Sequence, residues 1–270
     1  MNYYGLVGEK LSHSLSPKIH NTVFKNLSIE GGYKLFEIDK NNIDKLGEAM
    51  KVLSIKGVNV TIPYKEKVME QLDIISEEAK EIGAVNTILN KENKLIGYNT
   101  DYYGFKNMLL DKNILVENKK VVVLGTGGAS KAVVQYLLDA NAKEIFLVSR
   151  DIQGKKSKKG VKLIDYNMLK EIEGYLIINT TPVGMYPNSS NSPVSEEIIQ
   201  KYDCVVDLIY NPIETEFIKI GKKLGKITCG GLMMLVLQGI KADEIWENIE
   251  INKDIIEELY TILSKEFDKE

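Results

Sequence analysis

The chain has 270 residues, of which 44% are hydrophobic, so it can bury one large core or two medium-sized cores. Charged residues make up 27% of the chain and the formal net charge is -3, which excludes the strongly basic surface that nucleic acid requires. With 2 cysteines and 2 histidines, the chain has too few of these side chains for a disulfide framework or a histidine-rich metal site. The composition therefore predicts a small-molecule partner in a reducing compartment, with no nucleic acid and no metal.

The N-terminal segment, residues 1–17, lacks the charged and then apolar layout of a signal peptide. No apolar run approaches the ~20 residues that span a bilayer. The most apolar candidate, residues 230–240, is too short and contains Gln238, so we interpret it as the start of a buried helix. These features predict a cytoplasmic protein without a membrane span.

In chain order, apolar and polar stretches of the first part of the chain alternate as strands and helices do. Strands are expected at residues 3–7, 33–38, 57–62, 84–89 and 94–98. Helices are expected at residues 18–27, 43–53 and 103–110, with a broadly helical segment over residues 65–82. This alternation is typical of an α/β fold.

A second unit begins at residues 121–124, an apolar run of the kind found in a strand that is buried on both faces of a parallel sheet. A helix at 131–140 and strands at 144–148, 175–178 and 204–206 are expected after it, followed by helices at 232–246 and 253–267. The lysines at 155, 156, 158 and 159 form a local charge run, which predicts a solvated loop.

A glycine-rich loop, Gly125-Thr126-Gly127-Gly128-Ala129-Ser130, directly follows the apolar strand and precedes the expected helix. Glycines in this position permit a tight turn and let backbone N–H groups approach a pyrophosphate at the positive end of the helix. Because strand, loop, helix and strand occur in this order, we interpret the loop as a dinucleotide-binding site rather than a structural turn.

The end of the next strand indicates which dinucleotide binds. Proteins that bind NAD usually carry Asp or Glu there for the ribose 2'-hydroxyl, whereas this chain has Ser149 and Arg150. A guanidinium can bind the 2'-phosphate through paired hydrogen bonds, so the sequence favours NADP. The alternative is that Arg150 is only an exposed charge at a strand end.

A candidate chemical site follows the strand at residues 57–62, where Pro63 ends the strand and Lys65 comes just after it. Ligands of open α/β sheets bind at this carboxyl edge, and a lysine there can act as a proton donor or an electrostatic clamp. Lys65 alone is more often a surface charge. Asn86 and Asp101 also lie at the ends of short apolar runs and strengthen the prediction of a site.

Eight strings along nearly the whole chain occur in the same order as in shikimate dehydrogenases, a family that the sequence therefore resembles. The strings are SHSLSP, GVNVTIPYKE, GAVNT, GYNTD, GTGGAS, NTTPVGM, DLIYNP and GGLMMLVLQG. The family reaction is the reversible, NADPH-dependent reduction of 3-dehydroshikimate to shikimate in aromatic amino acid (chorismate) biosynthesis, and it needs no metal. The resemblance implies the same reaction for this chain.

The resemblance also implies roles for individual residues. Lys65 and Asp101 would form the catalytic pair, and which of them carries the transferred proton stays open. Substrate-binding residues would be Ser14, Ser16, Thr61, Lys65, Asn86, Asp101, Tyr210 and Gln238. Cofactor-binding residues would be Gly125, Thr126, Gly127, Gly128, Ala129, Ser149, Arg150, Leu208 and Gly231. Met233 stands where many members of the family have glycine.

We therefore expect two α/β domains. Residues 1–101, joined by the C-terminal helices in 239–270, would form a substrate-binding catalytic domain, and residues 102–238 a Rossmann-type domain whose parallel sheet binds NADP. Two alternatives stay open, an NAD-linked quinate/shikimate dehydrogenase and a non-catalytic metabolite sensor. The oligomeric state also stays open, with a homodimer as one option.

Overall fold

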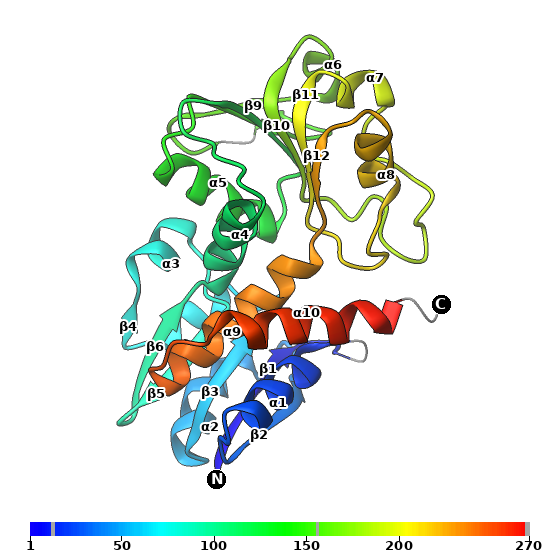
Figure 1. Ribbon diagram of the computed structural model, residues 1–270. Coiled ribbons are helices and arrows are strands. Elements are labelled where there is room, and N and C mark those ends of the chain that lie inside the picture. The colour runs from blue at the N-terminus through cyan, green and yellow to red at the C-terminus, as the bar shows by residue number, and fades with distance from the viewer. Residues whose placement is uncertain (12–13, 155–156, 268–270) are drawn as a thin grey trace. The chain divides into compact units, whose positions relative to one another are not determined.

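The computed structural model describes residues 1–11, 14–154 and 157–267, and the chain divides into two compact units (Figure 1). The first unit contains Met1–Gly104 and Val236–Thr261. The second contains Phe105–Leu235 and the described residues from Ile262 onward. Ser12 and His13 of the SHSLSP string, and two lysines of the predicted solvated loop, lie outside the described residues.

The first unit is built on a mixed sheet with the strand order β2-β1-β3-β5-β6-β4. β1 pairs in parallel with β2 and β3, whereas β5 runs antiparallel to both β3 and β6. The strands are β1 (Asn2–Gly8), β2 (Gly31–Glu37), β3 (Ile55–Val60), β4 (Ile74–Ile75), β5 (Thr87–Lys91) and β6 (Lys94–Tyr98). The helices that lie wholly in this unit are α1 (Ser16–Asn26), α2 (Leu46–Val52) and α3 (Glu77–Ile82), with 3-10 turns at Ile43–Lys45 and Lys67–Gln71. Three further helices have residues in both units: α4 (Thr100–Asp111), α9 (Leu232–Glu247) and α10 (Lys253–Phe267).

Apolar residues cover both faces of this sheet because neighbouring side chains along a strand point to opposite sides. In β1, Leu6 packs in a cluster with α1 and α9, and Val7 packs in a cluster with α2. Trp246 of α9 lies directly on β3 and donates a hydrogen bond from Nε1 to the Ile88 carbonyl at 3.0 Å. A Cβ atom on Gly57 would lie 2.3 Å from that nitrogen, so only glycine fits at this close approach.

Residues 65–82 were predicted to be broadly helical, and the segment is helical only in part because the sheet interrupts it. Only Lys67–Gln71 and Glu77–Ile82 are helical, and Ile74–Ile75 between them pairs in parallel with β6. The carboxylate of Asp73 accepts a hydrogen bond from the Leu95 amide at 2.7 Å, which fixes this edge pairing. The backbone groups that a continuous helix would use internally are therefore used by the sheet.

The second unit has a fully parallel sheet with the order β12-β11-β10-β7-β8-β9. Its strands are β7 (Lys120–Leu124), β8 (Glu144–Val148), β9 (Val161–Ile164), β10 (Gly174–Asn179), β11 (Tyr202–Asp207) and β12 (Ile227–Cys229). Its helices include α5 (Gly128–Asp139), α6 (Tyr166–Leu169), α7 (Glu196–Ile199) and α8 (Glu216–Lys223). The predicted Rossmann-type parallel sheet is confirmed, and the apolar run of β7 is buried as expected.

The strand order of this sheet reverses between β7 and β10. From β7 the chain proceeds outward to β8 and β9, then returns to β10 on the other side of β7 and continues to β11 and β12. Ligands of doubly wound sheets bind at such a reversal, beyond the carboxyl ends of the strands. The loops after β7 and β10 therefore form the expected ligand-binding edge of this unit.

Candidate active site

In the first unit, the topology gathers several predicted site residues at one edge of the sheet. Thr61 and Lys65 follow the end of β3, and Asp101 follows the end of β6. Asn86 immediately precedes β5, which is antiparallel to both strands and so begins at this same edge. The edge is held together by backbone hydrogen bonds, including Val60 N–H to the Asn86 carbonyl at 2.8 Å.

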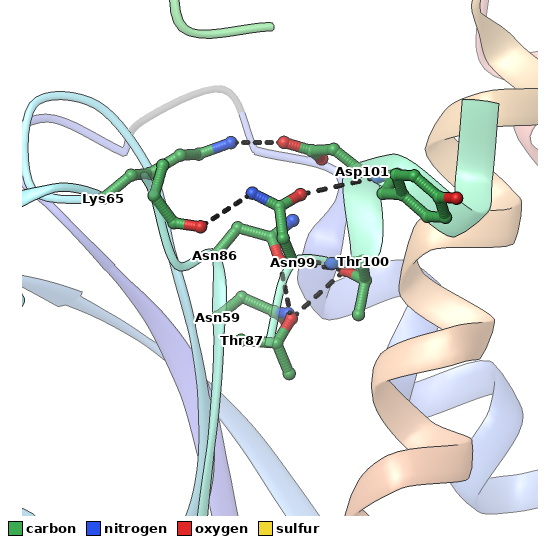
Figure 2. A network of polar contacts seen from close by, with 9 residues as sticks. Asn59, Lys65, Asn86, Thr87, Asn99, Thr100 and Asp101 are labelled. Carbon is green, nitrogen blue, oxygen red and sulfur yellow. Dashed lines mark hydrogen bonds and ion pairs between the residues drawn. The ribbon is translucent and has the colours of Figure 1, made fainter. Parts of the chain in front are cut away.

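Lys65 and Asp101 form an ion pair at this edge, and their side chains point toward one another (Figure 2). Lys65 Nζ lies 2.6 Å from Asp101 Oδ2, and the two side chains are 22% and 16% exposed. The amide of Val85 donates to the Lys65 carbonyl at 2.8 Å, which fixes the backbone that carries the lysine. An ammonium group has three N–H donors, so donors remain for a ligand beyond the one that Asp101 accepts.

The side chain of Asn86 is held in one orientation beside this pair (Figure 2). Its Oδ1 accepts from the Thr100 backbone amide at 2.7 Å and lies 3.1 and 3.2 Å from the hydroxyls of Thr87 and Thr100. All three residues are buried. The amide nitrogen of Asn86 finds no acceptor among the described residues, and a ligand can use it as a donor.

The other predicted substrate residues of the first unit lie on three elements. Ser14 follows β1, and its hydroxyl accepts a hydrogen bond from the backbone amide of Ser16, the first residue of α1, at 3.2 Å. Thr61 is bonded through its own amide to the Val7 carbonyl of β1 at 2.9 Å. Gln238 is half-buried on α9. Tyr210, also predicted to bind the substrate, belongs to the second unit, which contains the residues predicted to bind the cofactor.

The glycine loop of the second unit lies at the reversal between β7 and β10. Gly125 has a φ of 100°, and a Cβ there would lie 2.8 Å from Thr181 Cγ2 in the loop after β10. Gly127 and Gly128 have open space where a Cβ would stand. Gly127 caps α5 without any side-chain hydrogen bond, so first-turn N–H groups of a twelve-residue helix face this space. Thr126 is exposed and Ala129 half-buried on the same loop.

At the end of β8, Ser149 is buried and Arg150 is exposed. The Ser149 hydroxyl donates to the Asp151 carbonyl at 2.8 Å, which ties the strand end into a turn. The carboxylate of Asp151 accepts from the Gln153 amide at 2.9 Å and so belongs to the same turn. Within the described residues, Arg150 forms no ion pair, and its guanidinium is available to an anion.

A buried carboxylate connects the loops after β10 and β11. Asp207 accepts hydrogen bonds from the Ile209 amide at 3.0 Å, Asn179 Nδ2 at 3.0 Å and Thr215 Oγ1 at 2.7 Å. Burial raises the pKa of Asp207 from 3.8 to about 6, because these three neutral donors only partly replace water. Asp207 and Asn179 were not predicted as site residues, although each ends a strand in a string that the sequence analysis quoted.

The same region positions Leu208, Tyr210 and Gly231. The Leu208 amide donates to the Asn179 carbonyl, and the Gly231 amide donates to the Ile209 carbonyl, both at 3.0 Å. A Cβ on Gly231 would lie 2.1 Å from the Leu208 carbonyl oxygen, so the two backbones touch only because Gly231 lacks a side chain. Tyr210 is half-buried, with its ring 6.1 Å from that of Phe267.

These features define a class of protein. A parallel sheet of this order, with an open glycine loop at its reversal and an arginine at the next strand end, is the architecture of dinucleotide-dependent dehydrogenases. Comparisons with known proteins identify the family. Residues 6–88 match the family model described as "Shikimate dehydrogenase substrate binding domain".

Curated relatives and solved structures agree with this match. A protein of Clostridium beijerinckii named "Shikimate dehydrogenase (NADP(+))" is 56% identical, over 99% of this chain and all of its own length. The crystal structure of shikimate dehydrogenase 1 from Peptoclostridium difficile is 55% identical with a TM-score of 0.90 and covers 99% of both chains. A shikimate 5-dehydrogenase from Thermus thermophilus, in complex with NADP(H) and shikimate, is 31% identical with a TM-score of 0.85 and covers 97% of this chain and 99% of its own. The chain belongs to the shikimate dehydrogenase family.

The described part of the chain contains neither a metal-binding cluster nor a membrane-spanning helix. Within residues 1–11, 14–154 and 157–267, no three His, Cys, Asp or Glu side chains are grouped so that they would hold a metal ion. No helix in these ranges combines the length and the apolar character that crossing a bilayer requires.

Proposed function

We propose that this chain catalyses the reversible, NADP-linked reduction of 3-dehydroshikimate to shikimate, a step of aromatic amino acid biosynthesis. The names of its relatives and the NADP(H) and shikimate complex of a 31% identical structure support this function. The observation that carries it is the ion pair of Lys65 and Asp101 at a sheet edge lined with polar groups. In this proposal the first unit binds the substrate and the second binds NADP.

The first unit supplies groups that suit a small hydroxylated carboxylic acid. Hydroxyls of Ser14, Ser16 and Thr61 and the amides of Asn86 and Gln238 bind the substrate's carboxylate and hydroxyls. The family motif assigns Tyr210 to the substrate as well. These groups are neutral, so they recognise the substrate by the positions of their hydrogen-bond donors and acceptors. A compound whose hydroxyls do not match these positions leaves buried polar groups of the protein without a hydrogen bond. The assignment of each residue follows the family motifs and stays a prediction.

Lys65 and Asp101 are the proposed proton-transfer pair. When bound, NADPH supplies the hydride that the carbonyl carbon accepts. The developing negative charge on the carbonyl oxygen is stabilised by the Lys65 ammonium, which also has a proton to donate. Asp101 orients the ammonium through the 2.6 Å contact and can accept a hydrogen bond from a neighbouring substrate hydroxyl. In the reverse direction the same pair removes the proton.

The residues of the second unit fit NADP. The open space beside Gly127 and Gly128 and the uncapped N–H groups of α5 suit a pyrophosphate. The exposed guanidinium of Arg150 suits the 2'-phosphate, and the carboxylate of Asp151 is bonded within its own turn. Gly125, Thr126, Ala129 and Ser149 shape these two positions, and Leu208 and Gly231 line the strand edge where we place the nicotinamide.

The test is NADP reduction with shikimate, followed by the absorbance of NADPH. We expect turnover by the wild type and a loss of roughly 100-fold or more in kcat for Lys65→Met, the range expected for a general acid. Lys67→Met is the matched control, because Lys67 lies two residues away at the start of the next 3-10 turn, is exposed, and bonds to Asp44 and to the Lys40 carbonyl instead of to Asp101. Equal turnover by wild type and Lys65→Met would overturn the assignment of Lys65.

The same assay separates the alternatives. Faster oxidation of quinate with NAD than of shikimate with NADP would favour the quinate/shikimate dehydrogenase. Binding of NADP without turnover of any of the four substrate and cofactor combinations would favour a sensor. A homodimer and a cytoplasmic location stay predictions, which analytical ultracentrifugation and cell fractionation would test.

A further inference from the structure

A chain of buried hydrogen bonds runs beneath the proposed substrate site and ends at Asn86 (Figure 2). The Tyr33 hydroxyl donates to Asn59 Oδ1 at 2.7 Å, and Asn59 Nδ2 donates to Thr87 Oγ1 at 3.1 Å. Thr87 Oγ1 lies 3.1 Å from both Asn86 Oδ1 and Thr100 Oγ1. Exposure of these residues ranges from 0% to 8%, so their polar groups are largely shielded from solvent.

The direction of each bond follows from counting hydrogens. A threonine hydroxyl has one hydrogen, and Thr87 Oγ1 already accepts from Asn59, so Thr87 donates its hydrogen to Asn86 or to Thr100. If Thr87 donates to Thr100, the hydroxyl of Thr100 donates in turn to Asn86 Oδ1 at 3.2 Å. Either way Asn86 Oδ1 accepts from one hydroxyl and from the Thr100 backbone amide, which occupies both lone pairs of the oxygen.

We infer that Thr87 and Asn59 are positioning residues that make Asn86 a hydrogen-bond donor to the substrate. This inference rests on the proposed function. An asparagine amide turned by 180° would place its oxygen at the site and its N–H groups against the Thr100 amide and the hydroxyl. The buried chain prevents that orientation. The site therefore selects, at this position, a substrate oxygen that accepts a hydrogen bond.

The inference names two residues outside the predicted site. Asn59 lies on β3 and Thr87 on β5, and both are buried below the edge that carries Lys65 and Asp101. Thr87 Oγ1, Asn59 Oδ1 and Asn59 Nδ2 each take part in the buried chain of hydrogen bonds. Their effect on the substrate passes through Asn86, so it must disappear when the Asn86 amide is absent.

The experiment compares Thr87→Ser with Thr87→Ala. Both variants lose the same methyl group, and only Ser keeps the hydroxyl, so their difference isolates the hydrogen bond. We expect Thr87→Ser to stay within about 3-fold of the wild-type kcat/KM for shikimate and Thr87→Ala to fall by roughly 10-fold or more, the range for one buried hydrogen bond. The dissociation constant for NADP, measured by calorimetry, is expected to be unchanged in both.

A double-mutant cycle separates positioning from a general structural effect. In an Asn86→Ala background, replacing Thr87 by Ser or by Ala is expected to give the same kcat/KM, because the amide on which the hydroxyl acts is gone. Thr87→Val, which keeps the volume of the side chain, repeats the test if Thr87→Ala fails to fold. Thr228→Val in β12 of the second unit is the control for an isosteric threonine replacement in a strand.

Two results would overturn the inference. One is an equal kcat/KM for Thr87→Ser and Thr87→Ala in an otherwise wild-type chain. The other is an undiminished difference between them in the Asn86→Ala background, which would show that Thr87 acts independently of Asn86. Failure of the proposed function has a different signature, because then the wild type itself would not oxidise shikimate with NADP.

Discussion

Replacing Asp207 with asparagine is expected to change how the stability of the protein depends on pH. Asp207 is fully buried, its three donors are neutral, and its pKa is raised from 3.8 to about 6. The native state therefore binds a proton more tightly than the unfolded state does. The contribution of Asp207 protonation to the free energy of unfolding is complete below the pKa of this group in the unfolded chain, and it is lost as the pH rises through about 6. A shift of this size corresponds to about 3 kcal/mol in total.

Urea unfolding of both proteins from about pH 4.5 to about pH 7.5, followed by circular dichroism, measures this effect on either side of the raised pKa. Circular dichroism is preferable to fluorescence because the only tryptophan, Trp246, lies in the first unit. An asparagine at position 207 can accept from the Ile209 amide with its side-chain oxygen and donate to the Thr215 hydroxyl with its NH2 group, and it has no proton to gain or lose in this pH range. The free energy of unfolding of the wild type should fall by roughly 2 kcal/mol relative to Asp207→Asn across this range.

The control is Asp203→Asn, which removes an exposed carboxylate from the same strand. Its unfolding free energy should follow that of the wild type at every pH. A constant difference between wild type and Asp207→Asn over the whole range would refute the reasoning, because it would mean that Asp207 has the same proton affinity in the folded and unfolded chain.

Three further replacements test other parts of the structure. Gly125→Ala should weaken NADP binding about 10-fold or more in calorimetry, because the φ of residue 125 is 100° and the added Cβ would lie 2.8 Å from Thr181. An unchanged affinity for NADP would refute the close approach of Gly125 to Thr181. Arg150→Gln should weaken NADP binding roughly 10-fold and leave NAD binding unchanged; equal loss for both would contradict a 2'-phosphate contact. Gly57→Ala should lower the free energy of unfolding by about 1–3 kcal/mol, because its Cβ would stand 2.3 Å from Trp246 Nε1; an unchanged urea midpoint would argue against this contact.

Local rules in the sequence were enough to predict the glycine loop and a polar site around Lys65 at a strand end. The order strand, glycines, helix and strand occupies one continuous segment, and each element follows from its own residues. Lys65 and Asp101 were predicted as parts of a site because both follow apolar runs, and strand ends are where sites in α/β sheets form. That the two residues form a pair was implied by the resemblance to the family and not by the local pattern. Their 2.6 Å contact agrees with the prediction that they form a pair, while their roles in catalysis stay to be tested.

Long-range pairing is what the sequence did not reveal. The segment around Ile74 has the composition of a helix, and it became a strand because β6, more than twenty residues later, offers an unpaired edge. The role of Asp207 in joining two loops likewise depends on Asn179 from the neighbouring strand. The residue pattern of a segment does not show which strand lies next to it in the sheet. The pairing of Ile74 with β6 and the bond between Asp207 and Asn179 are therefore seen only in the three-dimensional structure.

Two asparagines at corresponding places show how hydrogen-bond counting separates a ligand-binding group from a structural one. Asn86 and Asn179 each lie at a sheet edge and each precede a threonine in the sequence. Asn179 accepts from the amide and hydroxyl of Thr181 and donates to the Val183 carbonyl and to Asp207, so its two donors and two lone pairs are all used inside the protein. Asn86 uses only its oxygen within the described residues. Because a satisfied amide has nothing to offer a ligand, Asn179 acts only through the loops that it joins, whereas the N–H groups of Asn86 are available to a ligand, as the proposed function requires.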